Sequence, residues 1–127
     1  QDFEIYAYEW GTQRIRQIFN GNSQNLIMQI IEATISPDNS RLLITGSGRQ
    51  SLSQIYQLDI NGENLKQLTE MENVSVSSPL WAEDSSCFYA SLHQNNTILE
   101  KSFAVFNAKG NLISYIDFTR TIKGWIR

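Results

Sequence analysis

Apolar and polar residues alternate over short stretches along most of the chain. Between Ile55 and Ile60, positions 56, 58 and 60 are apolar, and Asn61-Gly62 follows directly. A period of two in a segment rich in β-branched and aromatic residues predicts a β-strand. Asn-Gly is a strong signal for a two-residue hairpin turn of type I′, in which Gly takes a positive φ. We expect Asn64–Leu68 to be the returning strand of this hairpin.

A second turn is predicted upstream, at Ser36-Pro37-Asp38-Asn39-Ser40. Pro presets φ for a turn, and Asp and Asn tolerate turn geometry. The turn separates two strand-like segments, 31–35 and 41–45. The apolar residues of 26–34 also fit the spacing of a helix capped by Ser23. The register of the repeat described next favours a strand over 30–35.

The pattern repeats with a period of about 44 to 50 residues. Residues 3–8 and 16–19 align with residues 53–58 and 66–69, residues 33–44 align with 79–90, and residues 55–62 align with 103–110. Lys123-Gly124-Trp125 resembles the start of another copy, with Trp125 opposite Trp81. Repeats of this length are typical of propeller blades or helical arrays, and the strand pattern selects blades of four short antiparallel strands.

The sequence therefore predicts an all-β chain, a partial β-propeller in a single domain, 1–127. We place two strands of one blade at about 1–20, two full blades at about 26–70 and 72–118, and an opening strand at about 120–127. Propellers typically have about 4 to 8 blades, so open edges and half-covered faces remain. Three interpretations stay open: a piece of a larger propeller, assembly with copies of itself (two chains giving about six blades), or a short stack of sheets.

These residues resemble the repeats of TolB-like and WD-type β-propellers. A blade of that family carries a Trp-Ser-Pro-Asp-Gly-like turn after the inner strand, an Ile-Tyr pair in the third strand and a Leu-Thr pair after the hairpin. Residues 35–39 match the turn, with Ile for Trp and Asn for Gly, and Ile55-Tyr56 and Leu68-Thr69 match the rest. The next blade keeps Trp81 but reads Ala82-Glu83-Asp84-Ser85 at the turn and lacks the Ile-Tyr pair. The resemblance implies a propeller fold and, as in TolB-like proteins, protein binding in the periplasm.

Composition excludes several classes of function. Lys and Arg number 10 against 13 Asp and Glu, so the net charge of -3 excludes a basic nucleic-acid-binding protein. No apolar run approaches the roughly 20 residues of a membrane helix. The single Cys87 excludes an intramolecular disulfide and a multi-Cys zinc site, and the single His93 excludes most His-based metal sites. We expect a soluble chain with no nucleic acid, no membrane span, no metal and no cofactor.

Two loop motifs resemble ligand-binding loops without completing them. Asp59–Asn64 places oxygen-bearing side chains at alternate positions as a calcium loop does, but the following residues read as a strand that carries Glu70 away. Gly46-Ser47-Gly48-Arg49 follows a strand as a phosphate-binding loop would, but it lacks the later Gly and the Lys-Ser/Thr. We interpret the first as a plain hairpin and the second as a connection between strands.

The remaining candidates are single side chains. His93 lies in a polar stretch that we interpret as a solvated loop, and no Gly-x-Ser-x-Gly motif supplies a nucleophile. Cys87 begins an apolar segment and is expected to be buried and inert. Trp81 and Trp125 are expected in the core, whereas Trp10, near a hairpin tip, is the aromatic side chain most suited to contact a ligand or partner. Asn73 and Asn95 match the glycosylation sequon, a weak signal.

No catalytic, cofactor-binding or metal-binding residue is therefore predicted. The first hypothesis is a non-catalytic protein-interaction module that binds a protein partner and closes its ring by self-association, as a dimer. The second is the gating propeller of a prolyl-oligopeptidase-like hydrolase. The third is a carbohydrate-binding propeller, which predicts one aromatic site per blade, but Ile60 or Asn61 stands at the position of Trp10 in the next blade. The location expected is periplasmic or secreted, with a cytoplasmic location left open.

Overall fold

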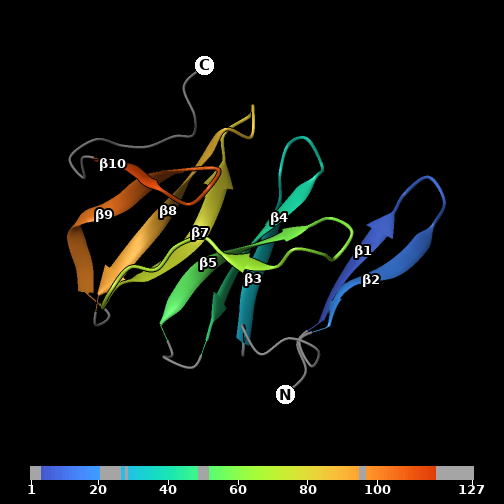
Figure 1. The fold of residues 1–127 in the computed structure, drawn as a ribbon, viewed down its shortest axis with the longest axis horizontal. Coiled ribbons are helices and arrows are strands. Elements are labelled where there is room, and N and C mark those ends of the chain that lie inside the picture. Colours follow the sequence, from blue (N-terminus) through green and yellow to red (C-terminus); the bar gives the residue numbers. More distant parts are fainter. Residues whose placement is uncertain (1–3, 21–26, 28, 49–51, 95–96, 117–127) are drawn as a thin grey trace.

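A computed structural model of the chain describes residues 4–20, 27, 29–48, 52–94 and 97–116 (Figure 1). The described residues form ten strands in three antiparallel sheets. Within that part of the chain, no helix is long and apolar enough to span a membrane. The first sheet pairs β1 (Glu4–Glu9) with β2 (Arg14–Asn20).

The other two sheets are four-stranded meanders. The middle sheet has the order β3 (Gln29–Ile35), β4 (Arg41–Ser47), β5 (Ser53–Asp59), β6 (Lys66–Gln67). The third sheet consists of β7 (Ser75–Trp81), β8 (Cys87–Gln94), β9 (Thr97–Asn107) and β10 (Leu112–Ile116). This confirms an all-β fold built of four-stranded antiparallel sheets.

The three sheets lie side by side in chain order, with the middle sheet between the other two (Figure 1). Successive side chains of a strand point to opposite faces, so a sheet covered on both sides buries every position. In β4 and β5 the neighbours Leu42 and Leu43 enter two different apolar clusters, as do Tyr56 and Ile55. The continuous burial of these two strands follows from packing on both faces.

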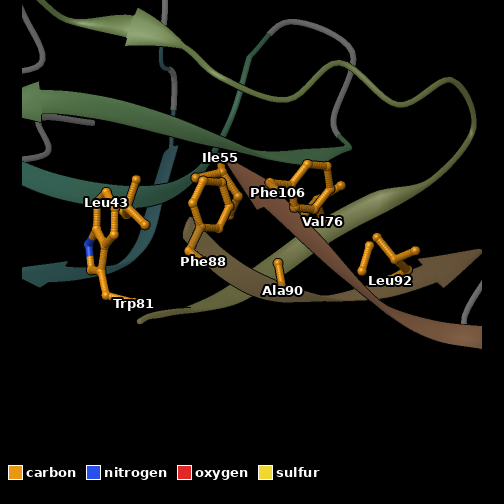
Figure 2. Close-up of a cluster of buried hydrophobic side chains, with 9 residues drawn as sticks. Leu43, Ile55, Val76, Trp81, Phe88, Ala90, Leu92 and Phe106 are labelled. Carbon is orange, nitrogen blue, oxygen red and sulfur yellow. The ribbon is translucent and has the colours of Figure 1, made fainter. Parts of the chain in front are cut away.

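One apolar cluster joins the first and middle sheets, and the other joins the middle and third sheets. The first contains Ile18, Phe19, Ile27, Leu42, Ile44, Tyr56 and Leu58. The second contains Leu43, Ile55, Val76, Trp81, Phe88, Ala90, Leu92, Ala104 and Phe106, and Figure 2 shows it extending from Trp81 and Leu43 at one end to Leu92 at the other. Each large apolar side chain buried in these junctions contributes about 1.5–3 kcal/mol.

The hairpin at Asn61-Gly62 forms, but the type I′ prediction is wrong. Gly62 has a φ of 88°, whereas Asn61 is not among the residues with positive φ, which a type I′ turn requires of both. The Gly62 N–H donates to the Asp59 carbonyl at 2.8 Å, which closes a three-residue loop. Gly110, with a φ of 87°, closes the equivalent loop of the third sheet. The returning strand is shorter than expected, because β6 spans only two residues.

Both hairpin glycines also touch the sheet before them. A Cβ at Gly62 would overlap the carbonyl oxygen of Ile18 in β2, and one at Gly110 would overlap that of Leu68 after β6. The contact therefore recurs at each junction. It explains Gly at these positions by close backbone approach as well as by positive φ.

The turn between the inner two strands forms in both complete sheets. Asp38 accepts hydrogen bonds from the Ser36 and Ser40 hydroxyls, both at 2.6 Å, and from the Ser40 N–H at 3.0 Å. These bonds hold the pKa of Asp38 at about 2. In the third sheet, Asp84 accepts from the Ser86 N–H and hydroxyl, which lowers its pKa in the same way. The turn geometry thus survives the loss of the Ser-Pro-Asp motif.

The strand prediction for 30–35 is confirmed by β3, and the helical alternative there is wrong.

The threonine of the Leu-Thr pair, Thr69, forms a hydrogen-bond network with Gln54. The Thr69 hydroxyl accepts the Ile55 N–H at 2.9 Å and donates to Gln54 Oε1 at 2.8 Å. Gln54 Nε2 donates to the Val74 carbonyl at 2.8 Å. This network attaches the segment that leads to β7 to strand β5.

The predicted opening strand at 120–127, with Trp125, lies outside the described residues.

Candidate interaction surface

The first sheet presents an exposed aromatic face on its side away from the middle sheet. We call Tyr6, Tyr8, Trp10 and Ile15 the outer aromatic face; their exposed fractions are 56%, 49%, 86% and 70%. The alternate residue Ala7 packs toward the middle sheet. Alternation along β1 therefore directs these rings away from the protein's own core.

The side chains of this face are ordered by contacts with one another. The Tyr8 and Trp10 rings meet edge to face, with centroids 5.3 Å apart and planes at 85°. Tyr8 lies opposite Ile15 across the hairpin. The Tyr6 hydroxyl donates to Glu4 Oε2 at 2.6 Å, and this hydrogen bond is the main cause that raises the Tyr6 pKa. The face is a preformed apolar platform with one carboxylate at its border.

The repeat shows which kind of surface this is. Each member of the outer aromatic face has a counterpart 50 positions later, and all four counterparts pack in the cluster between the first and middle sheets: Tyr56, Leu58, Ile60 and Leu65. The register is the same as well, since Tyr6 pairs with Gln17 as Tyr56 pairs with Gln67. The outer aromatic face thus has the pattern of a face that packs on a preceding sheet.

The third sheet carries the complementary kind of face. We call Leu80, Tyr89, Phe103 and Val105 the outer face of the third sheet; Leu80 is 40% exposed and the other three are half-buried. Across the strands, Tyr89 lies opposite both Leu80 and Val105. The equivalents of Tyr89 and Phe103 in the middle sheet are Leu43 and Ile55, which are fully buried against the third sheet.

The structure confirms the predicted places of two tryptophans. Trp10 lies in the turn after β1 and is the most exposed of the large apolar residues described. Trp81 is 5% exposed in the core, with its ring centroid 5.8 Å from that of Phe88. The Arg41 guanidinium lies 4.8 Å from the Trp81 ring centroid and donates to the Ser85 carbonyl at 3.2 Å. Trp81 is therefore a structural residue at the junction of two sheets.

Cys87 and His93 do not form a reactive pair. They lie near opposite ends of β8, and the six residue steps between them along the strand place their Cα atoms about 20 Å apart. Cys87 is half-buried, not buried as expected, because it begins the strand beside the turn. His93 is exposed, as expected, but it lies in a strand and not in a loop, since β8 and β9 extend beyond the equivalent strands of the middle sheet.

Neither of the two ligand-loop motifs forms a ligand-binding loop in the described residues: the first is a hairpin turn, and the second begins at the end of a strand. In the hairpin, Asn64 Nδ2 donates to Asp59 Oδ2 at 2.7 Å, so the side chain that began the calcium-like pattern is bonded within the turn. Gly46 and Ser47 end β4, and the next described element is the strand β5; Arg49 of this motif lies outside the described residues. Over the described ranges, no three His, Cys, Asp or Glu side chains gather as metal ligands do. Of the sequon residues, Asn73 lies exposed in a turn and Asn95 lies outside the described residues.

Sequence reasoning missed two features. The repeat predicts strands at Tyr6, Tyr8 and Ile15 but not their exposure, although their alignment with the apolar positions 56, 58 and 65 is a signal for a face that packs on another sheet. Glu32 gave no signal at all. Its Oε1 accepts from the Thr45 hydroxyl at 3.0 Å and from the Ser78 N–H at 2.7 Å, and so joins the middle sheet to the third.

Comparison with known proteins finds similarity in structure alone, since no family model and no curated protein matches the sequence. A TolB-type protein of Agrobacterium tumefaciens superimposes with a TM-score of 0.68 at 14% identity, over 88% of this chain and 40% of that one. The β-propeller domain of the Trilobed protease of Pyrococcus furiosus gives 0.64 at 20% identity, over 91% of this chain and 34% of that one. TolB of Acinetobacter baumannii gives a TM-score of 0.66 at 17% identity, over 90% of this chain and 26% of that one.

The chain thus spans between about a quarter and two fifths of the length of these three structures. All three alignments cover most of this chain, and their TM-scores are those of structures that share a fold. The three sheets of this chain are arranged as blades of a β-propeller, of the kind found in TolB and in the propeller domain of the Trilobed protease.

Proposed function

We propose that the chain is a non-catalytic protein-interaction module built of propeller blades, and that a protein partner binds on the outer aromatic face. The observation that carries the proposal is the exposure of Tyr6, Tyr8, Trp10 and Ile15 on one face of a two-stranded sheet. Contiguous exposed apolar side chains on a folded protein mark interaction sites. Tyr and Trp are the residues most enriched where proteins bind one another.

The geometry of the face supports a protein partner over a small ligand. The Tyr8 and Trp10 rings meet edge to face on a surface that the rest of the first sheet does not enclose. Small-molecule sites are concave and bury most of their ligand. A sugar-binding propeller would repeat its aromatic site in each blade, but Ile60 replaces Trp10 in the middle sheet and is packed against the core.

Site-specific crosslinking tests the proposal. A photoreactive phenylalanine analogue at position 10, in the cells that make the protein, is expected to give a defined protein adduct that mass spectrometry identifies. The matched control carries the same group at Lys109, which is exposed at the tip of the β9–β10 hairpin. An adduct that is absent, or equally strong at position 109, would contradict protein binding through this face.

A second candidate is favoured by one observation, the likeness to the propeller domain of the Trilobed protease. In that case the chain belongs to the propeller that gates a prolyl-oligopeptidase-like hydrolase. A peptidase assay on the full-length gene product separates the two candidates, because only the second expects peptide hydrolysis. The resemblance to TolB also supports a periplasmic or secreted location, which fractionation of the producing cells tests.

A further inference from the structure

We infer that the partner of the outer aromatic face is a second copy of this chain, bound head to tail through the outer face of its third sheet. This inference rests on the proposed function and names the occupant of the same surface. It follows from the way in which the sheets already pack within one chain.

At both junctions inside the chain, the same kind of face of the later sheet covers the opposite kind of face of the earlier sheet. At the first junction, the face of the middle sheet that carries Tyr56 and Leu58 covers the first sheet. At the second junction, the face of the third sheet that carries Phe88 and Phe106 covers the Leu43 and Ile55 face of the middle sheet. Each junction therefore joins two different faces, one of each kind. The outer aromatic face is of the first kind, and the outer face of the third sheet is of the second kind.

A second copy supplies a face of the complementary kind. Leu80, Tyr89, Phe103 and Val105 are uncharged, and the one carboxylate beside the aromatic face, that of Glu4, is engaged by the Tyr6 hydroxyl. Contact between the eight side chains that define the two faces therefore buries no charged group. Two copies contribute three sheets each, which makes six and falls within the roughly 4 to 8 blades of known propellers. Contacts between unlike faces close into rings when the rotation fits.

The first hairpin distinguishes this contact from the two inside the chain. Gly62 and Gly110 let the hairpin approach the backbone of the preceding sheet, but Thr12 stands at the equivalent position of the first hairpin. The Thr12 hydroxyl donates to Glu9 Oε2 at 3.0 Å. Thr12 is not among the residues with positive φ, and it carries a side chain where the two later hairpins carry none. We therefore expect the contact with a second copy to rest on side chains at this hairpin.

Charge substitutions on the two faces test the inference. Tyr8→Arg blocks the aromatic face and Leu80→Arg blocks the outer face of the third sheet; both side chains are partly exposed, so both variants are expected to fold. Lys109→Glu, at a hairpin tip, is the matched control. Circular dichroism and urea denaturation verify folding, and light scattering on a sizing column gives the mass.

We expect the wild-type chain and the Lys109→Glu variant to be discrete dimers. Each of the other two variants alone should dissociate about thirtyfold more readily or more, the effect of losing an interface anchor. An equimolar mixture of Tyr8→Arg and Leu80→Arg should associate again, because one copy keeps an intact aromatic face and the other an intact face on the third sheet.

Four results would overturn the inference. A wild-type monomer excludes a second copy as the occupant. A dimer that neither substitution weakens places the contact elsewhere. Dissociation by Tyr8→Arg alone, with no recovery on mixing, means that two aromatic faces pack on each other. An adduct of position 10 with a different protein would also overturn the inference, while leaving protein binding through this face in place.

Discussion

Replacing Gly62 with Ala perturbs a close backbone contact between two sheets. Gly62 has a φ of 88°, a conformation that costs an L-residue about 1–2 kcal/mol. The added Cβ would also overlap the carbonyl oxygen of Ile18 in the preceding sheet. Relieving an overlap between packed elements costs about 1–3 kcal/mol. We therefore expect Gly62→Ala to lower the free energy of unfolding by about 2–5 kcal/mol, a large part of the roughly 5–15 kcal/mol of a typical domain.

Urea denaturation followed by far-UV circular dichroism measures this loss, and the chain supplies its own control. A Cβ at Gly11 meets no atom within 4 Å, so Gly11→Ala should change stability by less than about 0.5 kcal/mol. Gly62→Asn separates the two causes. Asn tolerates positive φ, but its Cβ still meets Ile18, so Gly62→Asn should remain about 1–3 kcal/mol less stable than the wild type.

Two results would refute this reasoning. Equal denaturation midpoints for Gly62→Ala and Gly11→Ala would show that neither positive φ nor the approach to Ile18 matters. A Gly62→Asn variant as stable as the wild type would show that φ alone matters and that the sheets separate freely at this point.

Three further predictions concern the core, a buried network and a turn. Trp81→Ala should cost about 3–5 kcal/mol in urea denaturation because it empties a packed position, and a loss below about 1 kcal/mol would remove Trp81 from the core. Thr69→Val should cost about 1–3 kcal/mol and speed amide exchange at Ile55, whose N–H loses its acceptor, whereas Thr69→Ser should do neither. The Asp38 pKa is lowered from 3.8 to about 2, so its contribution to stability is present above about pH 4 and is lost as the pH falls toward 2. The urea midpoint of Asp38→Asn should therefore fall less between pH 4 and pH 2 than that of the wild type. Glu70→Gln, outside the turn, should keep the wild-type dependence on pH. If the two variants show the same dependence on pH, the assigned cause is wrong.

The turn after the inner strand shows why motif matching underestimates structural repetition. Asn39 and Ser85, 46 positions apart, have φ values of 59° and 60°, although one sits in Ser-Pro-Asp-Asn and the other in Ala-Glu-Asp-Ser. What the two turns share is an Asp carboxylate that accepts the N–H and hydroxyl of the Ser two residues later. That hydrogen-bonding pattern needs one Asp and one Ser at fixed spacing and no Pro.

Local chemistry alone determined the repeat, the strands and the turns of this protein. A period-two pattern sets which residues share a face, and Asp, Asn, Ser and Gly set where the chain reverses, so both can be read from neighbours in the sequence. The type of the Gly62 turn could not be read in this way, because Asn-Gly also fits a three-residue loop in which Gly alone takes a positive φ.

Only the tertiary structure decided which apolar faces are buried. Tyr6 and Tyr56 have the same residue type, the same register and the same predicted strand, yet Tyr6 is 56% exposed and Tyr56 is 2% exposed. The difference lies in whether a neighbouring sheet covers the face, and that depends on residues far apart in the chain. The candidate interaction surface was for this reason visible in the sequence as a repeat and recognisable as a surface only in three dimensions.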